Sequence, residues 1–143
     1  MQGEDDGMEE FGVPFRHAPS LDTYTAIHRQ VLIAYEYRCA LTGARFAPIA
    51  GLHPFLSVVP IQPRELGGPL HVANFLPLSE AAARAFAADH FLIADDFSIT
   101  VDHAVIDRTL ASRIEPRLRV PADPLYRPDP VHLAFRRRLI LGR

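Results

Sequence analysis

The chain has 143 residues, 48% of them hydrophobic and 22% charged, which corresponds to one domain with enough apolar material for a core. The sequence contains neither a run of about 20 apolar residues, as a membrane helix needs, nor the basic and apolar regions of a signal peptide. We therefore expect a cytoplasmic protein without membrane contact. A single cysteine, Cys39, excludes an intramolecular disulfide and a zinc site built from several cysteines.

The formal net charge of -2 is unevenly distributed along the chain. The first ten residues carry five acidic side chains and no basic one, so residues 11–143 hold 15 basic and 12 acidic side chains, a charge of +3. All 15 basic residues are arginine. We attribute this first to a GC-rich genome. The alternative is use of the guanidinium group, which binds a phosphate through two parallel hydrogen bonds.

The first half of the chain predicts an arm, a helix and a short strand. Residues 1–20 are acidic and then rich in glycine and proline, which is typical of a flexible arm. A helix is expected to begin at Ser20 or Asp22 and to end near Tyr37, because its apolar residues recur at helical spacing. A loop-rich segment follows. The run FLSVVPI at 55–61 then predicts a buried strand, kept short by its proline.

The second half predicts small antiparallel hairpins with helices around them. A loop at 63–73 leads into an apolar run at 74–78, and an alanine-rich helix starts after Ser79 and ends near 89. Residues 91–101 alternate around Asp95-Asp96, which we interpret as a hairpin turn rather than a catalytic carboxylate pair. The remaining predictions are a helix at 103–112, a strand at 117–120, a proline-rich crossing, and a helix at 130–141. The predicted fold class is α+β.

Six segments in this order resemble the HNH endonucleases, in their restriction-endonuclease-like branch. They are RCALTG at 38–43, IQPRELGG at 61–68, VANFLPLS at 72–79, RAFAADHFLIADDFSITV at 84–101, LRVP at 118–121 and RPDPVHLAFRRR at 127–138. The resemblance covers residues 23–142. It implies a ββα-metal core within a domain at 21–143, with flanking helices and small hairpins.

The resemblance also implies that the catalytic residues are missing. An HNH site needs a histidine as general base and a divalent cation held by a histidine, often with an aspartate. Counting along the matched motifs places the base position on Pro60 and the metal-ligand positions on Ala83 and Ala87, and only Asn74 is retained. Proline and alanine side chains neither accept a proton nor bind a metal. We therefore expect a degenerate, inactive nuclease domain without metal or cofactor.

Three histidines close in sequence to the degenerate positions define a competing hypothesis, an active nuclease with relocated ligands. They are His53, His71 and His90. We favour ordinary histidines hydrogen-bonded to the backbone, because a metal site needs three or four converging ligands.

Arginines define the expected contact with DNA. In the family, the ββα unit grips phosphates, and the matching candidates are Arg64 in the loop and Arg84 on the former metal-site helix, followed by Arg136, Arg137 and Arg138. Consecutive residues on a helix point 100° apart, so the last three cannot share one phosphate, and we expect one or two to pair with acidic neighbours. We therefore expect the protein to bind DNA weakly, without sequence preference and with a strong dependence on salt.

The alternative from another class is a protein-interaction or regulatory module, or a homodimer, on the same scaffold. The alanine-rich segment AAARAFAA at 81–88 would present an apolar face to a partner once the histidine and aspartate of the family are gone. The same residues would otherwise fill the core of the domain.

Overall fold

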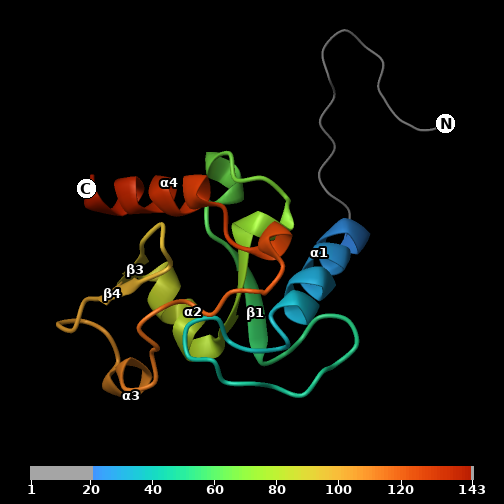
Figure 1. Cartoon of the computed structure of the whole chain (residues 1–143), viewed down its shortest axis with the longest axis horizontal. Coiled ribbons are helices and arrows are strands. Elements are labelled where there is room, and N and C mark those ends of the chain that lie inside the picture. The colour runs from blue at the N-terminus through green and yellow to red at the C-terminus, as the bar shows by residue number, and fades with distance from the viewer. Residues whose placement is uncertain (1–20, 143) are drawn as a thin grey trace, which may run out of the picture.

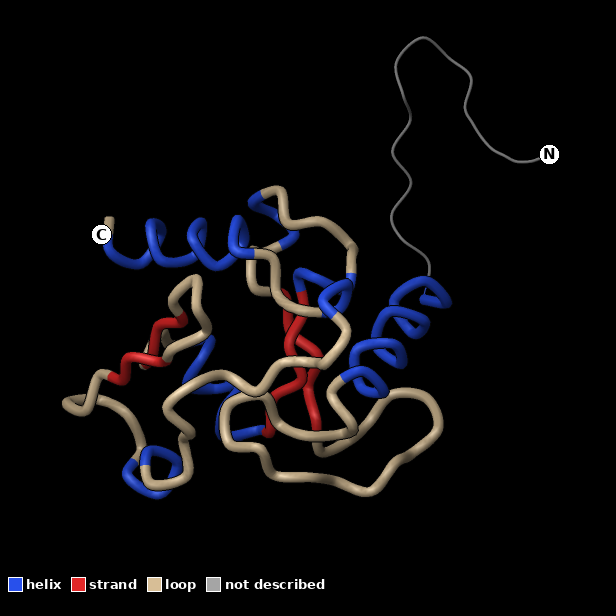
Figure 2. The backbone as a smooth tube through the Cα atoms, in the orientation of Figure 1, coloured by secondary structure: helices blue, strands red, loops and turns tan. Residues whose placement is uncertain are grey.

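A β-hairpin lies at the centre of the fold, in a computed structural model that describes residues 21–142. Its strands are β1 (Leu56–Pro60) and β2 (Phe75–Ser79), paired antiparallel with Leu56 opposite Ser79 and Pro60 opposite Phe75 (Figures 1 and 2). Residues 75–78 of β2 are all buried, because both faces of this strand are covered. The helices α1 (Leu21–Ala34) and α2 (Glu80–Ala87) contact both strands, and Figure 1 shows them on opposite sides of β1.

The helix α2 follows β2 without a connecting loop and completes a ββα unit. Its first turn is capped by Ser79, whose hydroxyl accepts a hydrogen bond from the Ala82 amide. Ala82, Ala85 and Phe86 are buried, so one side of α2 packs on the hairpin and the other side is open. The sequence signal for this helix, a serine followed by a glutamate and an alanine run, is confirmed.

The second hairpin and the last helix form the other half of the fold. The strands β3 (Phe91–Ile93) and β4 (Ile99–Val101) pair antiparallel, and the turn between them holds Asp95 and Asp96 as predicted. The helix α4 (Pro130–Leu141) has the predicted bounds and contacts β3. Shorter elements are α3 (Arg108–Ala111) and the 3-10 helices η1 (Arg64–Leu66), η2 (Val72–Asn74) and η3 (Pro124–Tyr126). The α+β class is confirmed.

The first helix ends three residues earlier than predicted. The Tyr37 amide bonds to Leu32 O and the Glu36 amide to Ile33 O, which together form a Schellman motif. Glu36 has a φ of 57°, the left-handed conformation that this motif requires at that position, and Tyr37 follows with a φ of 58°. Glycine is the usual residue there, so a glutamate gave the sequence no stop signal.

The helix predicted at 103–112 is present but shorter, at 108–111, and the strand predicted at 117–120 was wrong. The Asp102 side chain accepts a hydrogen bond from the Ala104 amide and so closes a separate turn. The helix starts only after Asp107, whose side chain accepts a hydrogen bond from the Leu110 amide. Residues 117–120 form a single bridge, between Arg117 and Ser98. The Leu118 amide bonds to Phe97 O and the Arg119 amide to Ala40 O, so successive amides bond to two different segments and no ladder continues.

Two expectations bear on the chain ends and on membranes. The arm predicted at 1–20 lies outside the described residues, as do the side chains of Ser20 and Asp22 that were expected to cap α1. Within 21–142, every helix is too short or too polar to cross a lipid bilayer.

Candidate nucleic-acid interface

Asn74 fixes the loop between the two strands of the ββα unit. Its side chain is fully buried, and its Oδ1 accepts from the Gln62 amide at 2.9 Å. Its Nδ2 donates to Gln62 O at 3.0 Å and to Pro69 O at 3.2 Å, while its main-chain oxygen accepts from the Ile61 amide at 2.8 Å. One amide side chain thus bonds to the backbone of Gln62 and Pro69 and braces the loop.

The glycine pair in the same loop is explained by this close packing. A Cβ atom on Gly68 would lie 1.9 Å from Gln62 O and 2.9 Å from Asn74 Nδ2, which no side chain could satisfy. Gly67 has a φ of 89°, in the left-handed region. Both glycines are therefore needed for the loop to fold back over Asn74.

The three positions that the HNH resemblance aligns with catalytic residues lie on the ββα unit. Pro60 is the last residue of β1 and is half-buried, Ala83 packs partly against the core, and Ala87 is exposed at the end of α2. None of these side chains carries a group that could take a proton or bind a cation. Within residues 21–142, no three histidine, cysteine, aspartate or glutamate side chains are grouped so that they could hold a metal ion.

The three candidate histidines occupy separate places. Buried His53 has both ring nitrogens engaged by backbone: Nδ1 accepts from the Phe55 amide, so Nε2–H donates to Ala47 O at 2.8 Å. Exposed His71 caps η2, its Nδ1 accepting from the Ala73 amide. His90 follows α2 and borders a hollow on the open side of that helix.

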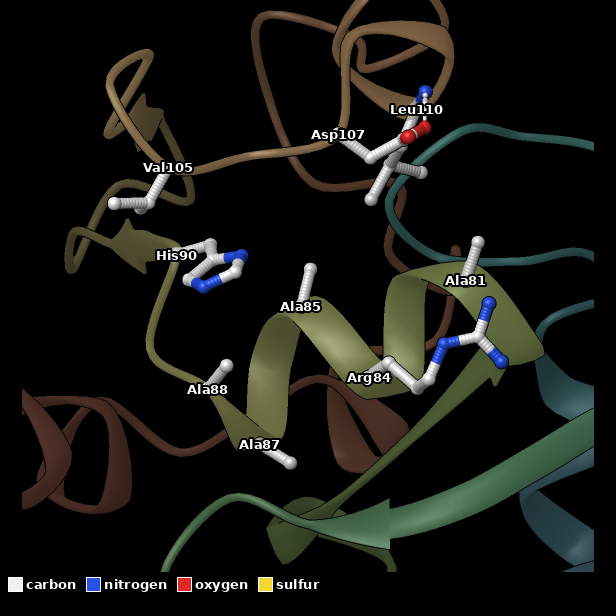
Figure 3. Close-up of a pocket in the computed structure, with 9 residues that line it drawn as sticks. All are labelled: Ala81, Arg84, Ala85, Ala87, Ala88, His90, Val105, Asp107 and Leu110. Atoms are coloured by element: carbon white, nitrogen blue, oxygen red, sulfur yellow. Dashed lines mark hydrogen bonds between the residues drawn. The ribbon is translucent and has the colours of Figure 1, made fainter.

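That hollow, about 830 Å³, lies between α2 and α3 (Figure 3). Ala81, Ala85 and Ala88 form much of its floor, and Val105, 53% exposed, stands at its edge. In Figure 3 Ala85 and Ala81 point toward the hollow, and Ala87, at the end of the helix, also borders it. The hollow is also lined by Arg84, His90 and Asp107, so its surface is apolar only in part.

Two of the five candidate arginines bind within the protein. The Arg136 guanidinium donates to Ile61 O at 3.0 Å and Phe86 O at 2.7 Å, and it forms an ion pair with Asp89 at 3.1 Å. It also lies 3.7 Å from the centre of the Phe86 ring. Arg137 donates to Ile93 O and pairs with Asp95 at 2.8 Å. The expected pairing with acidic neighbours is confirmed.

The other three arginines are exposed. Arg64 donates through Nη1 to Gly68 O at 3.0 Å, which closes the η1 loop. Arg84 pairs with Glu80 one turn earlier on α2, at 2.8 Å with both side chains in solvent. Such a pair is worth only about 0.3–0.5 kcal/mol, so an approaching phosphate can replace the glutamate. Arg138 is exposed on α4.

Sequence reasoning missed a polar contact beside the brace. Gln62, which bonds to Asn74 through its backbone, also places its Oε1 3.0 Å from Nδ1 of His132 on α4. Its Nε2 donates to Leu66 O, so Oε1 is the acceptor and Nδ1 of His132 carries the proton. Burial lowers the pKa of His132, Asp129 raises it and His71 lowers it further. The two residues lie 70 positions apart, and no local pattern signals such a pair.

Comparison with known proteins identifies the fold. No protein-family model matches the chain, and no curated protein matches it. Among solved structures, the chain is similar to a "Modification dependent TagI restriction endonuclease", with a TM-score of 0.61 and 23% sequence identity over 80% of this chain. The match spans 37% of that chain's length. The protein therefore has the fold of part of a restriction endonuclease.

Proposed function

We propose that this chain is a catalytically inactive HNH-nuclease-like domain that binds the phosphate backbone of DNA without sequence preference. The observation that supports the proposal is a ββα unit in which Asn74 braces the loop, while Pro60, Ala83 and Ala87 occupy the positions that the HNH resemblance assigns to catalytic residues. A nuclease-like domain that lacks the reactive side chains still has the same backbone shape and the same arginines on its surface. The similar solved chain is a restriction endonuclease, which supports DNA as the partner.

Arg64 and Arg84 are the proposed phosphate contacts on this unit, with Arg138 as a further exposed cation. Arg64 is held in place by its bond to Gly68, and Arg84 gives up only a weak surface pair when a phosphate arrives. Arg136 and Arg137 bind inside the protein, and we assign them to the scaffold. Phosphate contacts alone give binding that depends strongly on salt and little on base sequence.

Fluorescence anisotropy with a labelled duplex at several salt concentrations tests this proposal. Arg64→Ala and Arg84→Ala should each weaken binding and flatten the slope of log K against log salt by about one unit. Glu80→Gln should strengthen binding, because it frees Arg84. Arg29→Ala is the matched control: Arg29 is exposed on α1, on the other side of β1. Failure of the wild-type protein to bind at about 50 mM salt would overturn the proposal.

The hollow on α2 favours a second candidate, a protein-interaction module or a homodimer. An alanine floor with an exposed valine at its edge is a surface on which an apolar partner side chain could pack. Ala87→Glu places a charge beside this surface, and an unpaired charge at a packed interface is strongly unfavourable. Sedimentation velocity would show association in the wild-type protein that Ala87→Glu abolishes. A monomer under all conditions would exclude the homodimer.

A further inference from the structure

The loop that leads from α1 to β1 carries a cluster of aromatic rings at the start of β1. Buried His53 has both ring nitrogens bonded to the backbone of this loop, and one of these bonds comes from the Phe55 amide at 3.1 Å. Phe55 stacks on Phe46, with ring centroids 6.3 Å apart and 15° between the ring planes. The Phe46 amide in turn donates to Tyr37 O at 2.9 Å. Hydrogen bonds therefore fix the backbone under both phenylalanines before any partner binds.

Phe55 is nevertheless one of the most open apolar residues of the domain. It is 61% exposed, although it contacts the rings of Phe46 and His53. The pair Phe86 and Phe91, whose centroids lie 5.6 Å apart, is 4% and 2% exposed. Leaving an ordered aromatic ring in water gives up the burial that stabilises such a side chain elsewhere in the fold. The open surface of Phe55 is thus available to a partner that offers a flat apolar group.

The register of the central hairpin places Phe55 next to the start of α2. Leu56 lies opposite Ser79, so Phe55, one residue earlier, is at the level where α2 begins with Glu80. Glu80 is the ion-pair partner of Arg84. The strand β1 and the helix α2 also contact each other (Figure 1). The exposed ring and the proposed phosphate contact therefore lie at the same end of the hairpin.

The charges near the ring favour an anionic partner. Arg45, exposed beside Phe46, is the only charged residue among residues 44–55. On the other side, Glu80 is paired with Arg84 at 2.8 Å. A strand of DNA combines anionic phosphates with flat bases, and proteins that bind single strands pair cationic side chains with aromatic ones. An uncharged apolar peptide would leave both arginines without a role.

We propose that Phe55 stacks on an unpaired base of a DNA strand whose phosphates Arg84 and Arg45 bind. In a duplex both faces of each base are covered by neighbouring bases, so only an unpaired or terminal base has a face free for the ring. Stacking on an aromatic side chain depends little on which base is present. The proposal rests on the proposed DNA binding and adds to it a preference for single strands over intact duplex.

A tryptophan in place of Phe55 tests the stacking directly, because the chain contains no tryptophan. The fluorescence of Phe55→Trp should fall when a short oligothymidylate is added at about 50 mM salt, since a stacked base quenches the indole. Leu125→Trp is the matched control. Leu125 is 75% exposed on η3, which contacts η2 at the Pro60 end of the hairpin, and the fluorescence of this variant should not change. Equal quenching in both variants, or none in Phe55→Trp, would overturn the stacking.

Fluorescence anisotropy separates the stacking from the phosphate contacts. The wild-type protein should bind a labelled oligothymidylate more tightly than a duplex of the same length. Phe55→Ala should weaken binding to the single strand at least about fivefold and leave binding to the duplex unchanged. Phe55→Leu keeps an apolar side chain but removes the ring, so it should lose as much. Retention of wild-type affinity for the single strand by Phe55→Leu would show an apolar contact and no stacking.

The same titrations distinguish this proposal from the DNA binding on which it rests. If the wild-type protein and Phe55→Ala bind duplex and single strand alike, the stacking is wrong and the proposed DNA binding stands. If the wild-type protein binds neither substrate at about 50 mM salt, both proposals fail. If Phe55→Ala instead abolishes self-association in sedimentation velocity and leaves DNA binding unchanged, the ring belongs to an interface between two copies and the stacking is wrong.

Discussion

Replacing Arg136 tests whether this arginine holds the ββα unit and α4 together. Its guanidinium bonds to the residue that follows β1, to the last turn of α2, and to Asp89. The Arg136 side chain is 15% exposed and that of Asp89 is 14% exposed. Arg136→Met keeps the apolar length of the side chain and removes the charge, so it leaves two carbonyls and a buried carboxylate without this donor.

The expected loss of stability follows from these contacts. Hydrogen bonds to a charged group contribute about 1.5–3 kcal/mol each, and removing one partner of a buried ion pair costs about 3–5 kcal/mol. These effects overlap because one guanidinium makes all the contacts, so we expect a total of about 3–5 kcal/mol.

Urea unfolding monitored by circular dichroism measures this loss. The midpoint should fall in Arg136→Met with an unchanged m-value. Arg138→Met is the matched control on the exposed side of α4 and should shift stability by no more than about 0.5 kcal/mol. Asp89→Asn should reduce the effect of Arg136→Met, because the buried charge is then gone. A loss below about 1 kcal/mol, or an equal loss in the control, would show that Arg136 does not hold the ββα unit and α4 together.

Three further predictions concern the brace, pH and cleavage. Asn74→Ala should lower the free energy of unfolding by about 3 kcal/mol in the same urea assay, because it leaves the Gln62 amide and the carbonyls of Gln62 and Pro69 without this partner. A loss under about 1 kcal/mol would contradict the bracing role. Burial lowers the pKa of His132, so as the pH falls this histidine is protonated in the unfolded chain before it is protonated in the folded protein. The folded state therefore loses stability, and the urea midpoint should drop between about pH 7.5 and 5.5. The drop should be smaller in His132→Gln. Plasmid DNA should stay intact with Mg²⁺ or Mn²⁺ at micromolar protein, and metal-dependent nicking lost in His71→Ala or His90→Ala would restore the active-nuclease hypothesis.

Local patterns in the sequence determined the elements around which the fold is built. The apolar runs at 55–61 and 74–78, the Ser79 cap, the turn at Asp95-Asp96 and the helix from Pro130 are each encoded within a few neighbouring residues. Secondary structure that depends on such short-range signals can be predicted from the chain alone. The order of motifs also identified the nuclease-like scaffold, which the solved structure shares as a fold.

Tertiary contacts decided what the sequence left open. The end of α1 depends on a left-handed Glu36, and the segment at 117–120 remains irregular because its amides bond to two separate parts of the chain. The arginines at 136–138 look alike in sequence, yet Arg136 is drawn inward by two carbonyls and Asp89 from distant segments, whereas Arg138 stays in solvent. The reason is physical: a guanidinium binds whichever acceptors the fold brings within hydrogen-bonding distance, and those acceptors lie 47 to 75 residues away along the chain.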